Sequence, residues 1–186
     1  MKIIFAQGNP EPRFDGTRHN VGFAITDAWA QAHDADWKSA SKFAALTAEV
    51  TIDGEKVLLV KPTTYYNETG RSARAIADFY KIDTTTELLA IHDELALPLG
   101  TIRVRSKGSD AGNNGVKSLN AHLGDAYFRL RIGIMTDRHF DDMDFVLGRF
   151  SLEEQETLST VIAKATGLID EFIRGDLEVT SHSSSL

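Results

Sequence analysis

The chain has 186 residues, of which 42% are hydrophobic and 25% charged, and its formal net charge is −7. This length and composition predict one globular domain with a sizeable core, and the absence of cysteine excludes a disulfide framework and a cysteine-ligated zinc site. No apolar run approaches the roughly 20 residues of a membrane span, and the first residues do not resemble a secretion signal, so we expect a cytoplasmic protein.

The first elements predicted along the chain are a strand, a helix and a hairpin. Residues 2–6 form the apolar run of a strand, and the spacing of apolar residues after it predicts an amphipathic helix that begins at Val21 and that Asn20 can cap. Residues 46–60 contain two apolar runs around Gly54. Because glycine supports the positive φ of a tight turn, these runs predict a β-hairpin.

A polar stretch then leads to a second helix, whose inner face extends from Ala73 to Tyr80. Two strands are predicted next, at residues 88–91 and 101–105. The glycine-rich segment 107–115 follows them and predicts a loop.

The last third of the chain predicts a short helix near 116–123, a strand at 128–135 and a long helix. Ser151 and Glu154 have the spacing of a capping box at the start of that helix, and the apolar residues after them recur at helical spacing, which favours a packing role. Residues 179–186 are serine-rich and predict a flexible tail.

The order of these elements predicts the fold class. A hairpin and several possible crossovers favour an α/β fold with a mixed, mostly parallel, twisted sheet flanked by helices. We expect residues 1–178 to form a single three-layer domain of this kind.

The charge is unevenly distributed along the chain. Residues 101–131 contain six basic and two acidic side chains, a local charge of +4, so the rest of the chain carries −11. The basic residues are Arg103, Arg105, Lys107, Lys117, Arg129 and Arg131. A basic stretch within an acidic chain indicates a confined anion site and argues against a protein that coats nucleic acid with its whole surface.

Two polar clusters lie where predicted strands end. Residues 17–20 lie between the first strand and the first helix and contain His19, and His92-Asp93-Glu94 follows the strand at 88–91. Since α/β folds place their chemistry at such junctions, His19 and Asp93 could form a general base and the carboxylate that orients it. Taken singly, a histidine at a helix start and an aspartate in a turn are the commoner interpretations.

Several other chemistries lack their motifs. The chain has no Gly-x-Ser-x-Gly elbow, no Walker A sequence and no Gly-x-Gly-x-x-Gly fingerprint. Its histidines do not fall in pairs with metal-ligand spacing, and the acidic cluster at 141–144 is typical of a solvated turn. We therefore expect neither a metal nor a cofactor.

Six sequence blocks occur in an order that is far more specific than any one block. They are Gly8-Asn9-Pro10, Thr17-Arg18-His19-Asn20, Lys61-Pro62-Thr63-Thr64-Tyr65-Tyr66-Asn67, His92-Asp93-Glu94-Leu95, Asn114-Gly115-Val116-Lys117-Ser118 and Arg129-Leu130-Arg131-Ile132-Gly133-Ile134. Together, over residues 3–150, they resemble bacterial-type peptidyl-tRNA hydrolase. The resemblance implies a monomeric, metal-free cytoplasmic enzyme that hydrolyses the ester between a peptide and the 3′ end of tRNA and so recycles tRNA for translation.

The resemblance also implies roles for individual residues. His19 would activate a water molecule, Asp93 would fix and stabilise its ring, and Asn9 would help to distinguish a blocked peptidyl group from a free amino group. The residues implied to contact the substrate are Phe14, Tyr65, Asn67 and Asn114. Turn and capping roles for the asparagines, and core positions for the aromatic residues, are the ordinary alternatives.

A phosphate clamp is implied near Arg105 and Arg131. Arg103 and Arg105 alternate along one predicted strand, as do Arg129 and Arg131 along another, so each pair points to one face of the sheet. The clamp would contact the tRNA backbone and not its bases. A solvated sheet face is the alternative.

The chain departs from the family pattern at several positions near the expected site. Glu11 and Tyr66 stand where the family usually has Gly and Met, and Asn113 stands where it usually has His; Glu68 and Asp110 add further negative charge. These departures affect the substrate contacts and the loop before Asn114, and they leave His19 and Asp93 in place.

Two other functions match part of the pattern. A non-catalytic RNA-binding relative would keep the fold and the basic stretch, but the retention of the hydrolytic residues argues against it. A hydrolase of small N-acylated esters would need the base but not the basic stretch.

Overall fold

Eight strands form one sheet in the computed structural model, which describes residues 1–137 and 141–183. The strands are β1 (Lys2–Ala6), β2 (Lys38–Ala40), β3 (Ala45–Ile52), β4 (Glu55–Pro62), β5 (Leu88–Pro98), β6 (Thr101–Arg105), β7 (Phe128–Met135) and β8 (Ser181–Ser183). Their order across the sheet is β2-β3-β4-β1-β5-β7-β6-β8, with parallel pairing from β4 to β7 and antiparallel pairing outside it. The predicted mixed sheet is confirmed, with its parallel strands in the centre.

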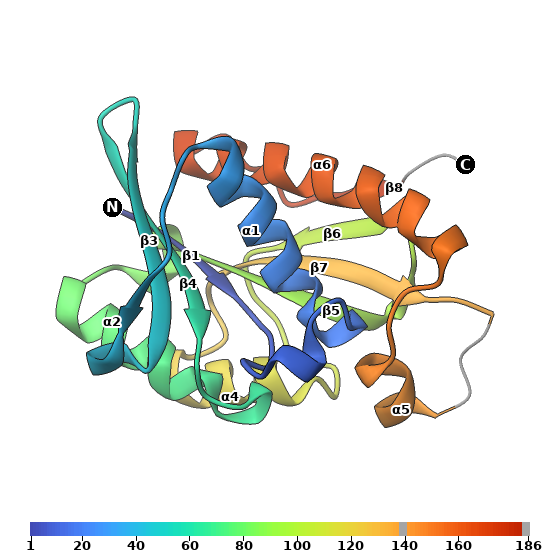
Figure 1. The fold of residues 1–186 in the computed structure, drawn as a ribbon. Coiled ribbons are helices and arrows are strands. Elements are labelled where there is room, and N and C mark those ends of the chain that lie inside the picture. Colours follow the sequence, from blue (N-terminus) through green and yellow to red (C-terminus); the bar gives the residue numbers. More distant parts are fainter. Residues whose placement is uncertain (138–140, 184–186) are drawn as a thin grey trace.

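Helices cover both faces of the sheet (Figure 1). The α-helices are α1 (Val21–Ala32), α2 (Thr69–Tyr80), α3 (Thr84–Glu87), α4 (Asn114–Leu123), α5 (Asp142–Leu147) and α6 (Leu152–Arg174), and the short 3₁₀ helices are η1 (Pro12–Phe14), η2 (Arg18–Asn20), η3 (Ser41–Phe43) and η4 (Tyr66–Glu68). Helices α1, α5 and α6 pack on one face, and α2 and α4 pack on the other. The α/β fold with helices on each side of the sheet is therefore confirmed.

Local signals account for the elements that the sequence predicts well. Asp53 and Gly54 both have positive φ, 48° and 85°, as a two-residue hairpin turn between β3 and β4 requires. The Ser151 side chain accepts a hydrogen bond from the Glu154 N–H while the Glu154 side chain accepts one from the Ser151 N–H, so the predicted capping box of α6 is present.

Several elements differ from the sequence prediction, which lacks β2 and α3, and three further differences have a physical cause in the structure. Strand β5 continues to Pro98 because β7 pairs with it as far as Glu94 and again at Pro98. Helix α5 replaces the turn predicted at 141–144, because the Asp141 side chain accepts hydrogen bonds from the N–H groups of Met143 and Asp144 and caps a helix. Strand β8 pairs with β6, so this part of the predicted tail lies against the sheet, whereas 184–186 are outside the described residues.

The central strands carry the core. Ile3, Ile4 and Phe5 of β1 are fully buried, because helices lie over both faces of this strand. Polar residues begin after β1, after β4 and, within β5, at His92, which is the same end of these parallel strands. None of the described helices is long and apolar enough to span a bilayer.

Candidate active site

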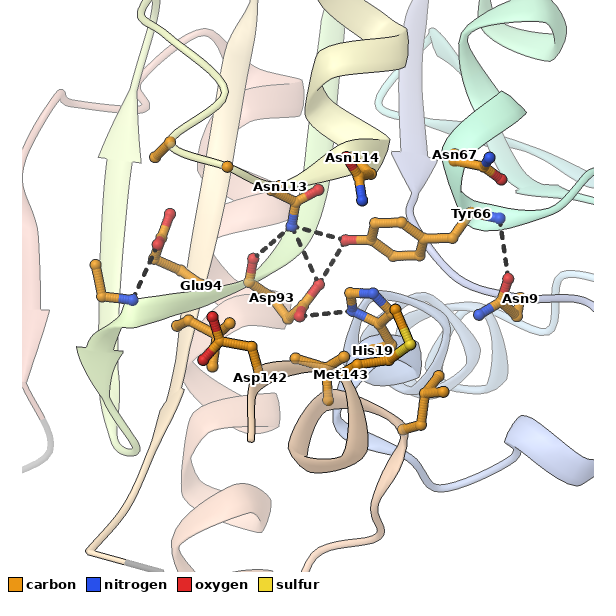
Figure 2. Close-up of a pocket in the computed structure, with 16 residues that line it drawn as sticks. Asn9, His19, Tyr66, Asn67, Asp93, Glu94, Asn113, Asn114, Asp142 and Met143 are labelled. Atoms are coloured by element: carbon orange, nitrogen blue, oxygen red, sulfur yellow. Dashed lines mark hydrogen bonds and ion pairs between the residues drawn. The ribbon is translucent and has the colours of Figure 1, made fainter. Parts of the chain in front are cut away.

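A cavity of about 580 Å³ opens at the end of the sheet where the polar residues after β1 and β4 and within β5 lie (Figure 2). Its wall combines polar side chains from segments that are far apart in the sequence: Asn9, His19, Tyr66, Asn67, Asp93, Glu94, Asn113, Asn114 and Asp142. Apolar residues of α5, including Met143 and Val146, close one side. Convergent polar groups in a partly apolar cavity are typical of a binding or active site.

His19 and Asp93 meet inside this cavity. His19 Nδ1 in η2 lies 2.7 Å from Asp93 Oδ2 in β5, and the Asp93 side chain is only 2% exposed. Burial alone would raise the pKa of the Asp93 carboxyl, but the charge and hydrogen bond of His19 and the hydrogen bond of Tyr66 outweigh it and lower the pKa below its ordinary value. Because an ionised carboxylate can only accept, Nδ1 is the donor to Asp93, and in the neutral ring Nε2 is the nitrogen with the lone pair.

Two further residues complete this cluster, and neither was assigned a role from the sequence. The Tyr66 hydroxyl donates to Asp93 Oδ1 at 2.5 Å, and its ring stacks on the His19 ring with centroids 3.9 Å apart and planes 7° from parallel. Asn113 Nδ2 donates to the Tyr66 hydroxyl at 3.0 Å and to the Asp93 carbonyl at 3.1 Å. The sequence feature that could have pointed to Tyr66 and Asn113 is that both depart from the family pattern.

Asn9 is held in place by its neighbours. Its backbone N–H donates to Asn20 Oδ1 and its carbonyl accepts from Asn20 Nδ2, each at 2.9 Å. Asn20 therefore clamps the chain after β1, and its side chain does not cap α1 as predicted. The Asn9 side-chain oxygen accepts from the Tyr66 N–H at 2.9 Å, so its amide Nδ2 group is the donor that it can offer to a bound molecule.

Of the other four residues predicted to contact substrate, two line the cavity and two do not. Asn67 and Asn114 line the cavity together with Asn9, His19 and Asp93. Within the described residues, the cavity wall does not include Phe14 or Tyr65. The Phe14 ring lies under the Arg13 guanidinium, 4.7 Å from its centroid, and Tyr65 is 54% exposed. A hydrogen bond to Glu11 raises the pKa of Tyr65, so this departure from the family pattern contacts a predicted substrate residue.

The four arginines of the basic stretch form two cross-strand pairs between β6 and β7. Arg129 is buried, and its guanidinium donates to the carbonyls of Gly108, Ser109 and Asp125, so it braces the glycine-rich loop. Arg129 therefore supports the structure of this loop from β7.

The two arginines predicted to clamp phosphate differ from each other. Arg131 Nε and Nη2 donate to the buried Glu94 Oε2 at 3.0 and 2.8 Å, which connects the arginine row to the cavity wall. Arg105 has no ion-pair partner among the described residues. Burial and the charges of Arg103 and Arg131 lower the pKa of Arg105, which reflects the concentration of positive charge on this face.

The described part of the chain offers no metal site. Over 1–137 and 141–183, no group of three or more His, Asp or Glu side chains is arranged to hold an ion. The chemistry that the cavity itself provides is that of a buried histidine–carboxylate pair surrounded by amide groups.

Comparisons with known proteins agree with one another. The family model described as peptidyl-tRNA hydrolase matches residues 3–185. The chain is 38% identical to the peptidyl-tRNA hydrolase of Ligilactobacillus salivarius, with 95% of each chain covered, and 43% identical to that of Chlorobaculum parvum, with 96% of this chain and 94% of the relative covered. The crystal structure of peptidyl-tRNA hydrolase from Acinetobacter baumannii superimposes with a TM-score of 0.88 at 31% identity, covering 94% of this chain and 89% of that one.

Proposed function

The chain belongs to the peptidyl-tRNA hydrolase family and hydrolyses the ester between peptide and tRNA, and we propose that it does so with a water molecule that His19 activates. The family membership confirms the resemblance carried by the six sequence blocks. The observation that supports the mechanism best is the 2.7 Å contact between His19 Nδ1 and Asp93 Oδ2 at the wall of an open cavity. This contact leaves Nε2 as the base.

The proposed reaction needs no covalent intermediate, because an aminoacyl ester is already activated. His19 Nε2 takes a proton from water, and the water oxygen attacks the ester carbonyl carbon. The tetrahedral intermediate then expels the ribose 3′ oxygen, which takes the proton from the imidazolium. Asp93 stabilises the imidazolium between these two steps, and the products are a tRNA 3′ hydroxyl and a peptide carboxylic acid, which releases its proton to solvent and becomes a carboxylate.

Amide side chains would hold the substrate beside His19. Asn9, Asn67 and Asn114 come from three different segments, and each amide offers both a donor and an acceptor. The Asn9 Nδ2 group, whose partner oxygen is used by the Tyr66 N–H, would distinguish an N-blocked peptidyl group from a free amino group. Phe14 and Tyr65 would contact the substrate outside the cavity wall.

The tRNA itself would bind through its phosphate backbone. Arg131 reaches the cavity wall through Glu94, and Arg105 lies one strand further along the same face. A clamp at these residues recognises phosphate and not base sequence. Since all the site residues belong to one chain, we propose that the enzyme acts as a monomer, in the cytoplasm where translation takes place.

Three substrates test this function against its alternatives. They are an N-blocked aminoacyl-tRNA, the same tRNA with a free amino group, and a small N-acyl amino-acid ester. A peptidyl-tRNA hydrolase cleaves the first far faster than the other two. A small-ester hydrolase cleaves the third equally well, and a non-catalytic RNA-binding relative binds the tRNA and cleaves nothing.

The His19→Ala variant tests the proposed base. Its kcat should fall by about 10²–10⁴-fold while tRNA binding and thermal stability stay close to wild type, because a general base acts on the chemical step. His33→Ala is the matched control, since His33 lies at the far end of α1 and stacks on Trp29. Activity near wild type in His19→Ala would remove His19 from the mechanism.

A further inference from the structure

We propose that Tyr66 and Asn113 are positioning residues of the His19–Asp93 pair, and that they hold Asp93 as an anion with its carboxylate locked against the imidazole. The proposal rests on the proposed function of that pair. Tyr66 touches both members, because its hydroxyl bonds Asp93 and its ring covers His19 (Figure 2). Asn113 is bonded to Tyr66 and to Asp93.

The two carboxylate oxygens of Asp93 have different partners. Oδ2 accepts from His19 Nδ1 at 2.7 Å, and Oδ1 accepts from the Tyr66 hydroxyl at 2.5 Å. Asp93 is 1% exposed and Tyr66 is 4% exposed, so neither bond competes with bulk solvent. A carboxylate bonded at both oxygens in a buried site cannot rotate without breaking one of these bonds. Tyr66 therefore fixes the direction in which Asp93 presents its charge to His19.

The direction of each hydrogen bond follows from the start of α4. Asn113 Oδ1 accepts from the Val116 N–H at 3.0 Å, so the other end of the amide must be the Nδ2 group that faces Tyr66. The Tyr66 oxygen accepts a hydrogen bond from Asn113 Nδ2, so the single hydroxyl hydrogen of Tyr66 is donated to Asp93 in a hydrogen bond. Burial first, and then the charge of Asp93, raise the pKa of Tyr66 well above its ordinary value, so this proton stays in place.

This arrangement favours the ionised state of Asp93. Oδ1 accepts a hydrogen bond from the Tyr66 hydroxyl and a longer one from Asn113 Nδ2, and Oδ2 lies against His19 Nδ1. A proton on the carboxyl would displace one of the donors at Oδ1 or occupy the position of the His19 Nδ1–H at Oδ2. The network thus favours the carboxylate, which is the form that stabilises an imidazolium.

The Tyr66 ring supplies the second constraint. It lies 3.9 Å from the His19 ring and nearly parallel to it, which fixes the plane in which Nε2 points. A π face next to imidazole also favours the cation that forms when His19 takes a proton. Gly115 leaves the space that the Tyr66 ring occupies, since a Cβ at position 115 would come within 2.4 Å of the Tyr66 ring atom Cε1.

Two substitutions at Tyr66 separate the hydroxyl from the ring. Tyr66→Phe keeps the stack and removes the donor to Asp93, and we expect kcat on N-blocked aminoacyl-tRNA to fall roughly tenfold while KM stays within about twofold. Tyr66→Leu removes both, and kcat should fall further. Tyr127→Phe is the matched control, because Tyr127 is fully buried and donates to Asn120 outside the site, and its kcat should equal that of wild type.

A double-mutant cycle distinguishes positioning from general damage to the fold. If Tyr66 acts through Asp93, adding Tyr66→Phe to Asp93→Asn should cost no further activity in single-turnover experiments. The ¹H resonance of His19 Nδ1, identified by its loss in His19→Ala, should move in Tyr66→Phe and stay in place in Tyr127→Phe. An additive cost, or an unmoved resonance, contradicts the proposal.

Asn113→Asp tests the same hydrogen bonds from their other end and does not depend on the folding of the Tyr66 variants. It keeps the oxygen that caps α4 and replaces the donor to Tyr66 with an acceptor, which competes with Asp93 for the hydroxyl proton. We expect a kcat loss at least as large as that of Tyr66→Phe. Wild-type kcat in both Tyr66→Phe and Asn113→Asp, with His19→Ala inactive, overturns this proposal and leaves the proposed function intact, whereas an active His19→Ala overturns the function itself.

Discussion

Asp93 gains its influence from its position within a strand. Its neighbours in the sheet are parallel partners in β7, and its side chain is almost completely removed from solvent. A carboxylate in such a place interacts strongly with the few groups that touch it, because water does not screen it. The effect of Asp93 on His19 therefore depends on the negative charge of the carboxylate as well as on the size and shape of the side chain.

Asp93→Asn tests this dependence on charge. The amide keeps the size of the side chain but cannot stabilise an imidazolium, so we expect kcat/KM to fall by about 10²–10⁴-fold with little change in thermal stability. Asp78→Asn, on the exposed side of α2 in an i,i+4 pair with Arg74, is the control. A loss smaller than threefold would give Asp93 a structural role only.

Among the helices, one ion pair fastens η2 to the start of α6. Arg18 Nη2 donates to Glu154 Oε2 at 2.6 Å, and Nη1 donates to the Arg149 carbonyl at 2.6 Å. The guanidinium also lies over the rings of Phe145 and Phe150, at 4.2 and 5.0 Å from their centroids. Since Arg18 precedes His19, these contacts position the segment of the proposed base against α5 and α6.

The ion pair between Arg18 and Glu154 depends on pH, because it requires an ionised Glu154 carboxylate. Burial alone would raise the pKa of Glu154, but the hydrogen bond from the Ser151 N–H and the charge of Arg18 lower it below its ordinary value of 4.5. A group whose pKa is lowered by folding stabilises the protein above its ordinary pKa. That stabilisation is lost as the pH falls through the lowered value.

Glu154→Gln should therefore destabilise the protein in a pH-dependent way. At pH 7 it leaves the buried Arg18 charge without its carboxylate partner, and we expect a loss of about 3–5 kcal/mol in the free energy of unfolding. As the pH falls below 4.5 the wild type progressively loses the same stabilisation, so the difference in Tm between the two proteins should shrink. Thermal unfolding from pH 7 to pH 3 measures this, with Glu156→Gln on the exposed side of α6 as the control. A difference that does not change with pH would contradict the assigned pair.

Over the protein as a whole, four arginines concentrate positive charge on one face of an acidic molecule. The net charge is −7, yet the paired arginines of β6 and β7 all lie on the sheet face that carries α4. Acidic surface elsewhere discourages nonspecific binding to nucleic acid, so under the proposed function the arginine row would direct tRNA toward the cavity.

Arg105→Gln combined with Arg131→Gln tests the row as a phosphate clamp. We expect KM for N-blocked aminoacyl-tRNA to rise by a similar factor for different tRNAs, because backbone contacts do not depend on sequence, and the small ester to be cleaved as before. The plot of log affinity against log salt should flatten by roughly 0.7–0.9 for each phosphate group that the variant no longer binds. Lys164→Gln, exposed on α6 over the other face of the sheet, is the control. An unchanged slope and KM would mean that the tRNA binds elsewhere, for example at Lys107 and Lys117.

Local sequence was enough to predict most elements and the pair at the centre of the site. The hairpin at Gly54 and the capping box at Ser151 depend on residues within a few positions of each other, so they are visible locally. His19 and Asp93 could be predicted because each follows an apolar run typical of a strand, and the carboxyl ends of parallel strands meet at one edge of a sheet, although β5 itself continues past Asp93. The roles of Phe14 and Tyr65 toward substrate stay predictions.

The surroundings of that pair follow only from the way the chain packs. Tyr66 and Asn113 are 47 positions apart, and nothing in either local sequence shows that their side chains meet on Asp93. The same holds for the ion pairs of Arg131 with Glu94 and of Arg18 with Glu154, which join charged side chains that are far apart in the sequence. Local patterns specify helices, strands and turns through interactions along a short stretch of chain, whereas these contacts depend on which strands pair and how closely the helices pack.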